Sequence, residues 1–407
     1  MISLIKSIRK KLLWILLSLA AFMIWGSGIY YGQYLKDYYQ SVSIRINEAG
    51  VTKSSLDRAL EYESEKGEPD VPVITAWNLI EKQIIVNKES GTSSSLRLIE
   101  VYGDMRQVYP MELIIGNIPD VEDAAGCLID EHTAYQIFGT TDAAGCMLDV
   151  SNKQYYIRGV IKSQVPMIFI QSSKEDKAYS NLELVYDKKD NGNQRANDFM
   201  FQNALSNSYT IIDGCFYAQL LGPLCQIPAW FLGFFMLCQL LRAIWKRRSL
   251  PLQVLALSLV FIIAWIGIKW FMEFRIKIPE SLIPTKWSDF SFWTDKFNSL
   301  KNNLDQLTYL MPIPKDVIMM KIVKSCISYN LIALAAMIII VIHKKVFITR
   351  SSGIELSILA GMVELAAILI LYNAGKEFHL TKGYIGMLPL FMLLQATVAQ
   401  RRGSNIF

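Results

Sequence analysis

Histidine and the short motifs of catalysis are scarce in this chain of 407 residues. It contains three histidines, His132, His343 and His379, which are too few and too scattered for a histidine-based triad or a two-histidine metal site. The HExxH and GxSxG motifs are also absent. We therefore expect no catalytic and no metal-binding residues, and we interpret His132 as a surface residue in the first turn of a helix. A hydrolase is kept only as a third hypothesis.

The sequence also lacks the phosphate-binding loop GxxxxGK[ST]. That loop cradles the phosphates of ATP in a large class of ATPases, so this chain cannot hydrolyse ATP by that route. We expect no cofactor in the chain itself. If ATP drives its function, the ATPase must be another polypeptide.

Cysteine is infrequent, and none of the six cysteines forms a CxxC pair. Cys238 and Cys326 lie in apolar segments, where we expect small core residues. The other four are predicted to face outward, where disulfides are permitted, and two pairings stay open: Cys127 with Cys146, and Cys215 with Cys225.

Positive charge is in excess only beside apolar segments. Residues 33–227 contain 17 basic and 27 acidic side chains, and the remainder of the chain contains 24 basic and 9 acidic ones. Basic residues that flank apolar helices are explained by the positive-inside rule and by anionic lipid. The net charge of +5 therefore gives no reason to expect binding to nucleic acid.

Long apolar runs are abundant, and 52% of the residues are hydrophobic. Residues 1–11 form an amphipathic segment suited to a cytoplasmic membrane surface, and residues 12–32 are long enough to span a bilayer. Five further apolar segments follow, at residues 228–241, 252–271, 322–342, 354–372 and 385–399. We predict six transmembrane helices in a multi-pass membrane protein.

The basic flanks of these segments predict the orientation. The predicted second, fourth and sixth helices are followed by basic side chains, namely Arg242, Lys246, Arg247 and Arg248, then Lys344, Lys345 and Arg350, and finally Arg401 and Arg402. By the positive-inside rule both termini are cytoplasmic and residues 33–227 lie outside. The predicted domains are residues 1–32, with the amphipathic segment and first helix; residues 33–227, outside the membrane; and residues 228–407, with five helices and an external loop at 272–321.

Residues 33–227 have the pattern of a soluble α+β domain. Alternating apolar residues predict strands, and one-face apolar spacing predicts helices. The expected strands are residues 42–46, 74–87, 95–103, 167–171, 182–187 and 209–212, and the expected helices are residues 54–66 and 196–205. About 190 residues are enough to bury a core of their own.

The stretch from Cys127 to Ile161 is the most informative part of the sequence. An apolar run ends at Asp130, which can cap a short helix that Gly139 ends. Gly145 then marks a tight backbone site, and residues 147–150 and 155–161 alternate on either side of residues 151–154 as a hairpin. The predicted order is strand, helix, hairpin.

This order, with Ala-x-x-x-Phe-Gly on the helix, an Asp-x-x-Gly turn and Tyr-x-Ile-x-Gly-Val on the last strand, resembles the extracytoplasmic core domain of MacB/FtsX-type ABC transporter permeases. The resemblance implies a permease subunit that transmits ATP-driven motion from a separate ATPase to an outer domain, for export of a peptide or lipid-linked substrate. It also implies a homodimer or a pairing with a second permease. The chain departs from the MacB pattern by having five predicted helices after the domain instead of three.

Two sets of residues follow as candidate sites. The basic turns Lys246, Arg247 and Arg248, and Lys344 and Lys345, are candidate contacts for the ATPase subunit. Glu364, in the fifth apolar segment, is a candidate intramembrane polar site, with a hydrogen-bonded contact between helices as the alternative reading.

Two further expectations stay open. The external loop contains an apolar stripe at Trp293, Phe297, Leu300, Leu304 and Leu307, which predicts an amphipathic helix lying on the membrane or under the outer domain, or docking a partner. The alternative to the permease is a membrane receptor or scaffold that binds an envelope partner without transport.

Overall fold

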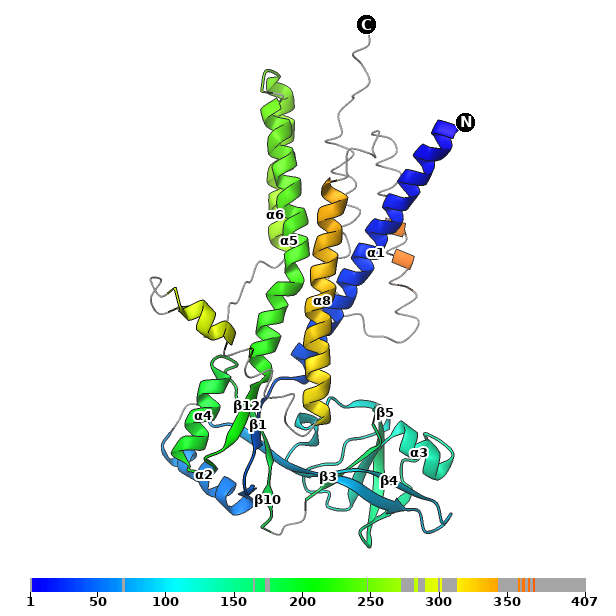
Figure 1. Cartoon of the computed structure of the whole chain (residues 1–407), viewed down its shortest axis with the longest axis vertical. Coiled ribbons are helices and arrows are strands. Elements are labelled where there is room, and N and C mark those ends of the chain that lie inside the picture. Colours follow the sequence, from blue (N-terminus) through cyan, green and yellow to red (C-terminus); the bar gives the residue numbers. More distant parts are fainter. Residues whose placement is uncertain are drawn as a thin grey trace. The chain divides into compact units, whose positions relative to one another are not determined.

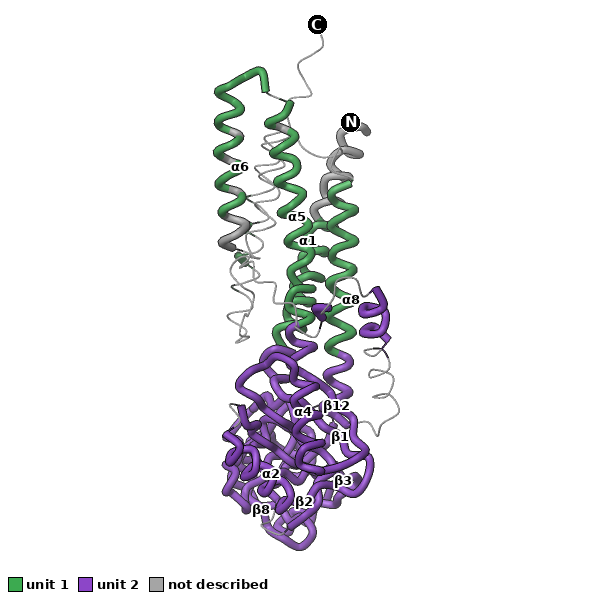
Figure 2. The backbone as a smooth tube through the Cα atoms, turned by 90° about the vertical axis from the view of Figure 1, so that its left-hand side faces the viewer, with its two compact units in different colours: residues 1–34, 220–277, 322–407 green, residues 35–219, 278–321 purple. Residues whose placement is uncertain are grey.

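The computed structural model describes most of the chain up to Ile342. The described residues are 2–67, 70–163, 165–172, 176–246, 248–271, 282–284, 290–298, 301 and 313–342, together with 358, 361–362, 365–366 and 369. The chain divides into two compact units (Figure 2). We call residues 35–219 and 278–321 the α+β unit, and residues 1–34, 220–277 and 322–407 the helical unit.

The α+β unit is built on a mixed sheet that has ten strands in the described residues. In chain order they are β1 (Val42–Ile46), β3 (Val73–Val86), β4 (Ser93–Tyr102), β5 (Glu112–Gly116), β6 (Gly126–Asp130), β7 (Met147–Val150), β8 (Lys153–Lys162), β9 (Met167–Gln171), β11 (Asn181–Val185) and β12 (Tyr209–Asp213). In space they run β12-β1-β11-β3-β4-β9-β6-β8-β5, with β7 pairing with β3 and β8 (Figure 1). The pairs β4–β9 and β6–β8 are parallel and the others antiparallel. β2 (Val51–Thr52) and β10 (Ala178–Tyr179) form a separate two-stranded sheet.

Three helices cover parts of this sheet. α2 (Lys53–Glu65) begins at the cap Thr52, and α4 (Gly192–Gln202) lies against β1 and β12 (Figure 1). α3 (Glu131–Phe138) lies against β4, β6 and β8, and a short 3-10 helix spans Met105–Gln107. Each helix buries a small apolar face, because its apolar residues recur at helical spacing.

The strand–helix–hairpin order predicted for residues 127–161 is confirmed. The Asp130 carboxylate accepts hydrogen bonds from the backbone N–H groups of His132 and Thr133, both at 3.0 Å, and Gly139 ends α3 at φ 72°. β7 and β8 then form the hairpin. Its turn is shorter than predicted, because Ser151 and Asn152 both adopt positive φ and close a two-residue connection, so β8 begins at Lys153.

The other predicted strands and helices of this unit are present, with ends shifted by up to four residues. Sequence reasoning missed β2, β5 and β10. β2 and β10 contain only two residues each, and the three central residues of β5 are all at least partly exposed, so none carries a clear alternation.

The helical unit contains most of α1 (Ile2–Tyr38), α5 (Gly214–Lys246), α6 (Pro251–Phe271) and α8 (Pro314–Ile342). Of the described helices, α5 and α8 are long and apolar enough to cross a membrane, judged by length and composition. α5 and α8 start 14 and 8 residues before the predicted segments, and α1 joins the two predicted N-terminal segments into one helix. The fifth and sixth predicted segments lie largely or wholly outside the described residues, so the count of six helices stays a prediction.

α1, α5 and α8 pack closely in the helical unit. Trp25 of α1, Met236 of α5 and Met337 of α8 belong to one buried apolar cluster. Gly28 and Gly32 lie one turn apart on α1, and a methyl group added to them would come within 2.6 Å of Asn330 Nδ2 and 2.7 Å of Cys225 Sγ. Small residues at this spacing let helices approach closely.

Candidate functional site

Four charged side chains meet in the interior of the α+β unit. They are Arg45 of β1, Glu183 of β11, and Lys315 and Asp316 in the first turn of α8. None is more than 9% exposed. Two positive and two negative charges balance, so the group, which we call the ion cluster, is buried without net charge.

The contacts within the ion cluster are short and directional. Arg45 donates two hydrogen bonds to Asp316, from Nε at 2.9 Å and from Nη2 at 2.8 Å, and a third from Nη1 to Glu183 at 3.0 Å. Lys315 Nζ lies 2.6 Å from the other oxygen of Glu183. Bidentate Arg–carboxylate contacts of this kind are among the strongest hydrogen bonds in proteins.

Neutral groups donate further hydrogen bonds to the carboxylate oxygens of Glu183. The hydroxyls of Ser43 and Ser41 donate to Oε2 at 2.5 and 3.0 Å, and the indole N–H of Trp77 donates to Oε1 at 3.2 Å. Arg45 also lies over the Trp77 ring, 5.2 Å from its centroid. The glutamate is therefore held by donors from strands β1 and β3, by the segment before β1, and by α8.

The strand register explains why these residues meet. Ser43 is directly opposite Glu183 in the antiparallel β1–β11 pair, and Arg45 lies two residues further along the same face of β1. α8 begins at Pro314, a residue suited to the first helical position, and Asp316 places a carboxylate in its first turn. A polar strip on β1 thus meets the charged start of α8.

Electrostatics favour the ionised form of Glu183. Burial alone would raise the pKa of this carboxyl, but the charges of Lys315 and Arg45 and their hydrogen bonds lower the pKa to about 2. For Arg45, burial opposes the charge, and the nearby Asp316 and Glu183 carboxylates more than compensate, so its pKa is raised. Glu183 and Arg45 are therefore both stabilised in their charged forms, whereas burial lowers the pKa of Lys315.

Backbone contacts join this cluster to the ends of two other helices. The Tyr39 hydroxyl donates to the carbonyl of Lys315 at 3.1 Å, and the N–H of Gly214 donates to the carbonyl of Ser41 at 3.2 Å. Only three residues separate α1 from β1, and α5 follows β12 directly. α1 therefore connects to β1 and α5 to its partner strand β12, while the first turn of α8 contacts β1 and β11, the neighbour on the other side of β1.

The residues predicted as ATPase contacts are described in part. Lys246 ends α5 and is exposed, and Arg248 is exposed with its guanidinium 5.7 Å from the Trp245 ring centroid. Arg247, Lys344 and Lys345 lie outside the described residues, and so does Glu364. The ATPase-contact assignment and the intramembrane polar site stay predictions.

Among the histidines, His132 is exposed in the first turn of α3, as predicted, whereas His343 and His379 lie outside the described residues. In the part of the chain that the structure describes, no group of three or more histidine, cysteine or acidic side chains could hold a metal ion.

The two disulfide pairings considered from the sequence are not formed, and all six cysteines are free. Cys225 instead has its sulfur 3.5 Å from that of Cys326, and Asn330 Nδ2 lies 3.4 Å from Cys225 Sγ. The helix packing explains the correction: α5 and α8 pack together in the helical unit and bring these two thiols into contact.

Sequence reasoning missed the ion cluster. The sequence does contain features that could have indicated buried charges. Arg45 and Glu183 are charged residues within short apolar strands, and Lys315-Asp316 directly follows Pro314. All five residues of β1 are buried, so Arg45 could not be exposed by the usual alternation. The pairing itself depends on a sequence separation of 271 residues between Arg45 and Asp316, which no local pattern encodes.

No protein-family model matches the chain, and no curated protein matches it by sequence. Solved structures are similar to it over less than half its length. The periplasmic region of MacB from Actinobacillus actinomycetemcomitans matches with 10% identity and a TM-score of 0.36, covering 43% of this chain and 89% of that one.

A second similar structure is the extracellular domain of the ABC-type transporter YknZ from Gram-positive bacteria, with 13% identity and a TM-score of 0.34, covering 42% of this chain and 99% of that one. Both similar structures are domains from outside the membrane, one of MacB and one of an ABC-type transporter. The likeness is one of fold, and it assigns no substrate or partner to this chain.

Proposed function

We propose that this chain is the permease subunit of an ABC-type transporter and works with an ATPase on a separate polypeptide. Its α+β unit lies outside the bacterial cell membrane, both termini are cytoplasmic, and six helices cross the bilayer. The transported substrate is a peptide or a lipid-linked molecule, and the permease acts as a homodimer or beside a second permease.

The observation that carries this proposal is the ion cluster at the start of α8. α8 is apolar enough to cross a membrane, yet its first turn carries Lys315 and Asp316, which are buried against β1 and β11. A buried ion pair that loses one partner is destabilised by about 3–5 kcal/mol, so α8 cannot move at this end without moving the sheet. A membrane helix fixed in this way can pass a displacement to the outer domain.

The continuity of the other helices supports the same role. α1 leads into β1 and α5 follows β12, with no long linker at either junction. Flexible linkers would absorb motion, whereas a three-residue connection and a direct one transmit it. The alternative of a receptor or scaffold is compatible with the same fold, but it gives no role to three helices that join the sheet at the neighbouring strands β12, β1 and β11.

Purification in gentle detergent tests the proposal. A protein with a Walker A motif and measurable ATPase activity should co-purify with the full-length chain. Reproducible purification with other envelope proteins and without any ATPase would favour the scaffold and contradict the permease.

A pair of double variants tests the coupling role. Arg45→Met with Asp316→Leu removes both ion pairs of Arg45 and leaves Lys315 with Glu183, whereas Lys162→Met with Glu112→Leu removes an exposed pair of 3.6 Å between β8 and β5. We expect the first variant to keep the ATPase bound but to uncouple α8 from the sheet, measured as a nucleotide-dependent spin-label distance change between α8 and β1 that the wild type does not show. The second variant should behave like the wild type.

A further inference from the structure

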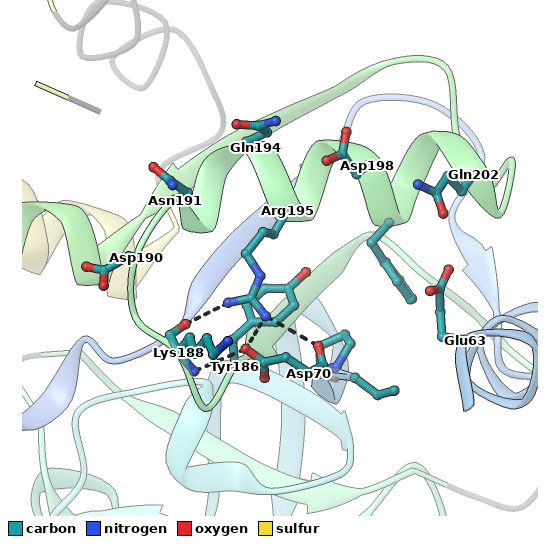
Figure 3. A pocket seen from close by; sticks show the side chains of 13 residues that line it. Glu63, Asp70, Tyr186, Lys188, Asp190, Asn191, Gln194, Arg195, Asp198 and Gln202 are labelled. Carbon is teal, nitrogen blue, oxygen red and sulfur yellow. Dashed lines mark hydrogen bonds and ion pairs between the residues drawn. The ribbon is translucent and has the colours of Figure 1, made fainter. Parts of the chain in front are cut away.

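A polar pocket of about 530 Å³ lies in the α+β unit and shares no residue with the ion cluster. Its walls are α4, the last turn of α2, residues 70–72 and residues 186–191 after β11 (Figure 3). Neither the permease role nor any motif in the sequence accounts for this pocket.

One side of the pocket is formed by an ion pair between Arg195 and Asp70 that further hydrogen bonds hold in place. Arg195 pairs with the Asp70 carboxylate, donates to the carbonyl of Lys188 at 2.7 Å, and lies 4.0 Å above the Tyr186 ring. Asp70 also accepts from the N–H groups of Asp187 and Lys188. Burial acts to raise the pKa of Asp70, but these N–H donors and Arg195 lower it. The Asp70 carboxylate and the Arg195 guanidinium therefore neutralise each other.

The Tyr186 hydroxyl is a buried polar group whose lack of a hydrogen-bond partner needs an explanation. Tyr186 is only 5% exposed, and its hydroxyl has no hydrogen-bond partner among the residues that the structure describes. Its ring lies beneath the Arg195 guanidinium, and its oxygen is directed toward the side of the pocket where Glu63 lies (Figure 3). Buried hydroxyls nearly always have a partner, because an unpaired one is costly.

The charges that remain around this hydroxyl are mainly negative. Once Asp70 and Arg195 are set aside as a pair, the lining holds the carboxylates of Glu63, Asp190 and Asp198 against the single ammonium of Lys188. Glu63 is itself 7% exposed, and its Oε1 accepts from Asn203 at 2.8 Å and lies 3.9 Å from Lys66 Nζ, which balances one of the three negative charges. Asp190 and Asp198 then remain against Lys188. A cation is therefore favoured over an anion in the pocket.

The pocket also offers apolar surface. Val71, Pro72 and Phe199 line it beside the polar groups. A ligand with an aliphatic chain and a charged end could place its chain against these residues and its end among the carboxylates.

We propose that this pocket binds a primary ammonium group on an aliphatic chain, such as the lysine side chain of an extracytoplasmic peptide. The ammonium donates hydrogen bonds to the Tyr186 hydroxyl and to the Glu63 carboxylate, and Asp198 adds electrostatic attraction. The proposal goes beyond the permease role and does not depend on it, because the binding can be measured in the full-length chain without an ATPase.

Ligand-observed NMR or calorimetry on the full-length protein in nanodiscs tests this site. The probe is Nα-acetyl-lysine amide, and the control is Nα-acetyl-norleucine amide, which has an aliphatic chain without the ammonium. For a ligand of this size we expect a Kd on the order of 1 mM for the lysine probe. Binding of the norleucine probe should be at least about 10-fold weaker, the factor set by losing one charge-assisted hydrogen bond.

Two variants make the test specific. Tyr186→Phe keeps the ring under Arg195 and removes only the hydroxyl, and Glu63→Gln removes one charge. Each should weaken the lysine probe by roughly 10-fold, since each removes about one hydrogen bond to the ammonium. The control Asp142→Asn, an exposed carboxylate in the turn after α3, should leave binding unchanged.

The melting temperature separates binding from folding. Tyr186→Phe should melt at or above the wild-type temperature, because the lost hydroxyl has no partner in the described residues. Equal binding of the lysine and norleucine probes, or unchanged lysine binding in Tyr186→Phe, would overturn the proposal and leave the pocket with water only.

Discussion

Glu183 shows how much a single buried carboxylate can organise. It has no exposed surface, and its two oxygens accept from Arg45, Lys315, Trp77, Ser41 and Ser43. A buried charge is tolerated only when it is paired and hydrogen-bonded, and here both conditions hold. The donors come from three separate parts of the chain, namely residues 41–45, Trp77 and Lys315, so the contacts of Glu183 form only when these parts have assembled.

Glu183→Gln should destabilise the protein by about 3–5 kcal/mol, because Arg45 and Lys315 would keep their buried charges with one carboxylate fewer. Urea unfolding of the full-length protein in detergent measures this change. Glu112→Gln is the matched control, since its pair with Lys162 is exposed and such pairs contribute at most about 1 kcal/mol. Similar losses in the two variants would mean that the ion cluster is not a buried network.

Stability should also fall in acid through Glu183. Its folded pKa is about 2, below the ordinary value of 4.5, so the stabilisation is fully present above pH 4.5 and is lost as the pH falls toward 2. The expected contribution is on the order of 3 kcal/mol at 1.36 kcal/mol per unit. Unfolding free energies measured from pH 6 to pH 2 should show this loss in the wild type, and the loss should be smaller in Glu183→Gln.

At the scale of elements, α3 has its two ends set by single residues. Asp130 accepts the first N–H groups of the helix and also the N–H of Met167 on β9, at 2.9 Å. Gly139 ends the helix at φ 72°, and a methyl group added there would meet nothing within 4 Å. The strain of a substitution at Gly139 would therefore come from the backbone alone.

Gly139→Ala should cost about 1 kcal/mol, the usual penalty for a non-glycine residue in the left-handed region. Gly26→Ala is the comparison, because Gly26 also has open space but lies inside α1 without a positive φ, where alanine is favoured. Chemical unfolding of each variant should give opposite signs. A loss at Gly26 and none at Gly139 would contradict the assigned end of α3.

The thiols of α5 and α8 provide a test of helix packing. Mild oxidation of the full-length protein should link Cys225 to Cys326, because their sulfurs are 3.5 Å apart and a disulfide needs only a modest closing movement. Peptide mapping by mass spectrometry without reduction detects the cross-link, and Cys225→Ser should remove it while Cys238→Ser should not. Recovery of a Cys127–Cys146 peptide instead would disagree with the structure.

At the scale of the whole molecule, the orientation across the membrane is the prediction with the widest consequence. A cysteine introduced at Asp142, in the exposed turn after α3, should react with a membrane-impermeant maleimide in intact cells. A cysteine at Arg248, after α5, should react only once the membrane is opened. The wild type gives the background of its six native thiols, and the reverse pattern would invert the topology.

The sequence predicted the local structure of the α+β unit well, because its signals were local. Asp130, Gly139 and Gly145 are cap and turn residues whose effect extends over a few neighbouring residues. The alternation of apolar and polar residues located β1, β3, β8 and β9. The ion cluster and the pocket around Tyr186 were not predictable in this way. Both depend on residues that are far apart in the chain and meet only because of the order of the strands in the sheet. Local patterns in a single sequence do not predict that order.

The same limit explains the helix starts. Lys315 and Asp316 fall in the external loop predicted for residues 272–321, because the predicted apolar segment begins at residue 322. Their charges are neutralised by Arg45 and Glu183, which makes a helix start at Pro314 possible. Likewise α5 passes through Pro223 and Pro228, where propensity alone predicts an end.

β3 links three separate parts of the apolar core, because this one strand supplies Ala76, Trp77 and Ile85 to three different buried clusters. Between them the backbone bulges at Lys82, with φ 60°, and the register to β4 shifts. The bulge therefore lies between the part of β3 that packs into the first two clusters and the part that packs into the third. Deuterium uptake should be fastest at this bulge, and the amides on its two sides should lose protection together when the protein unfolds.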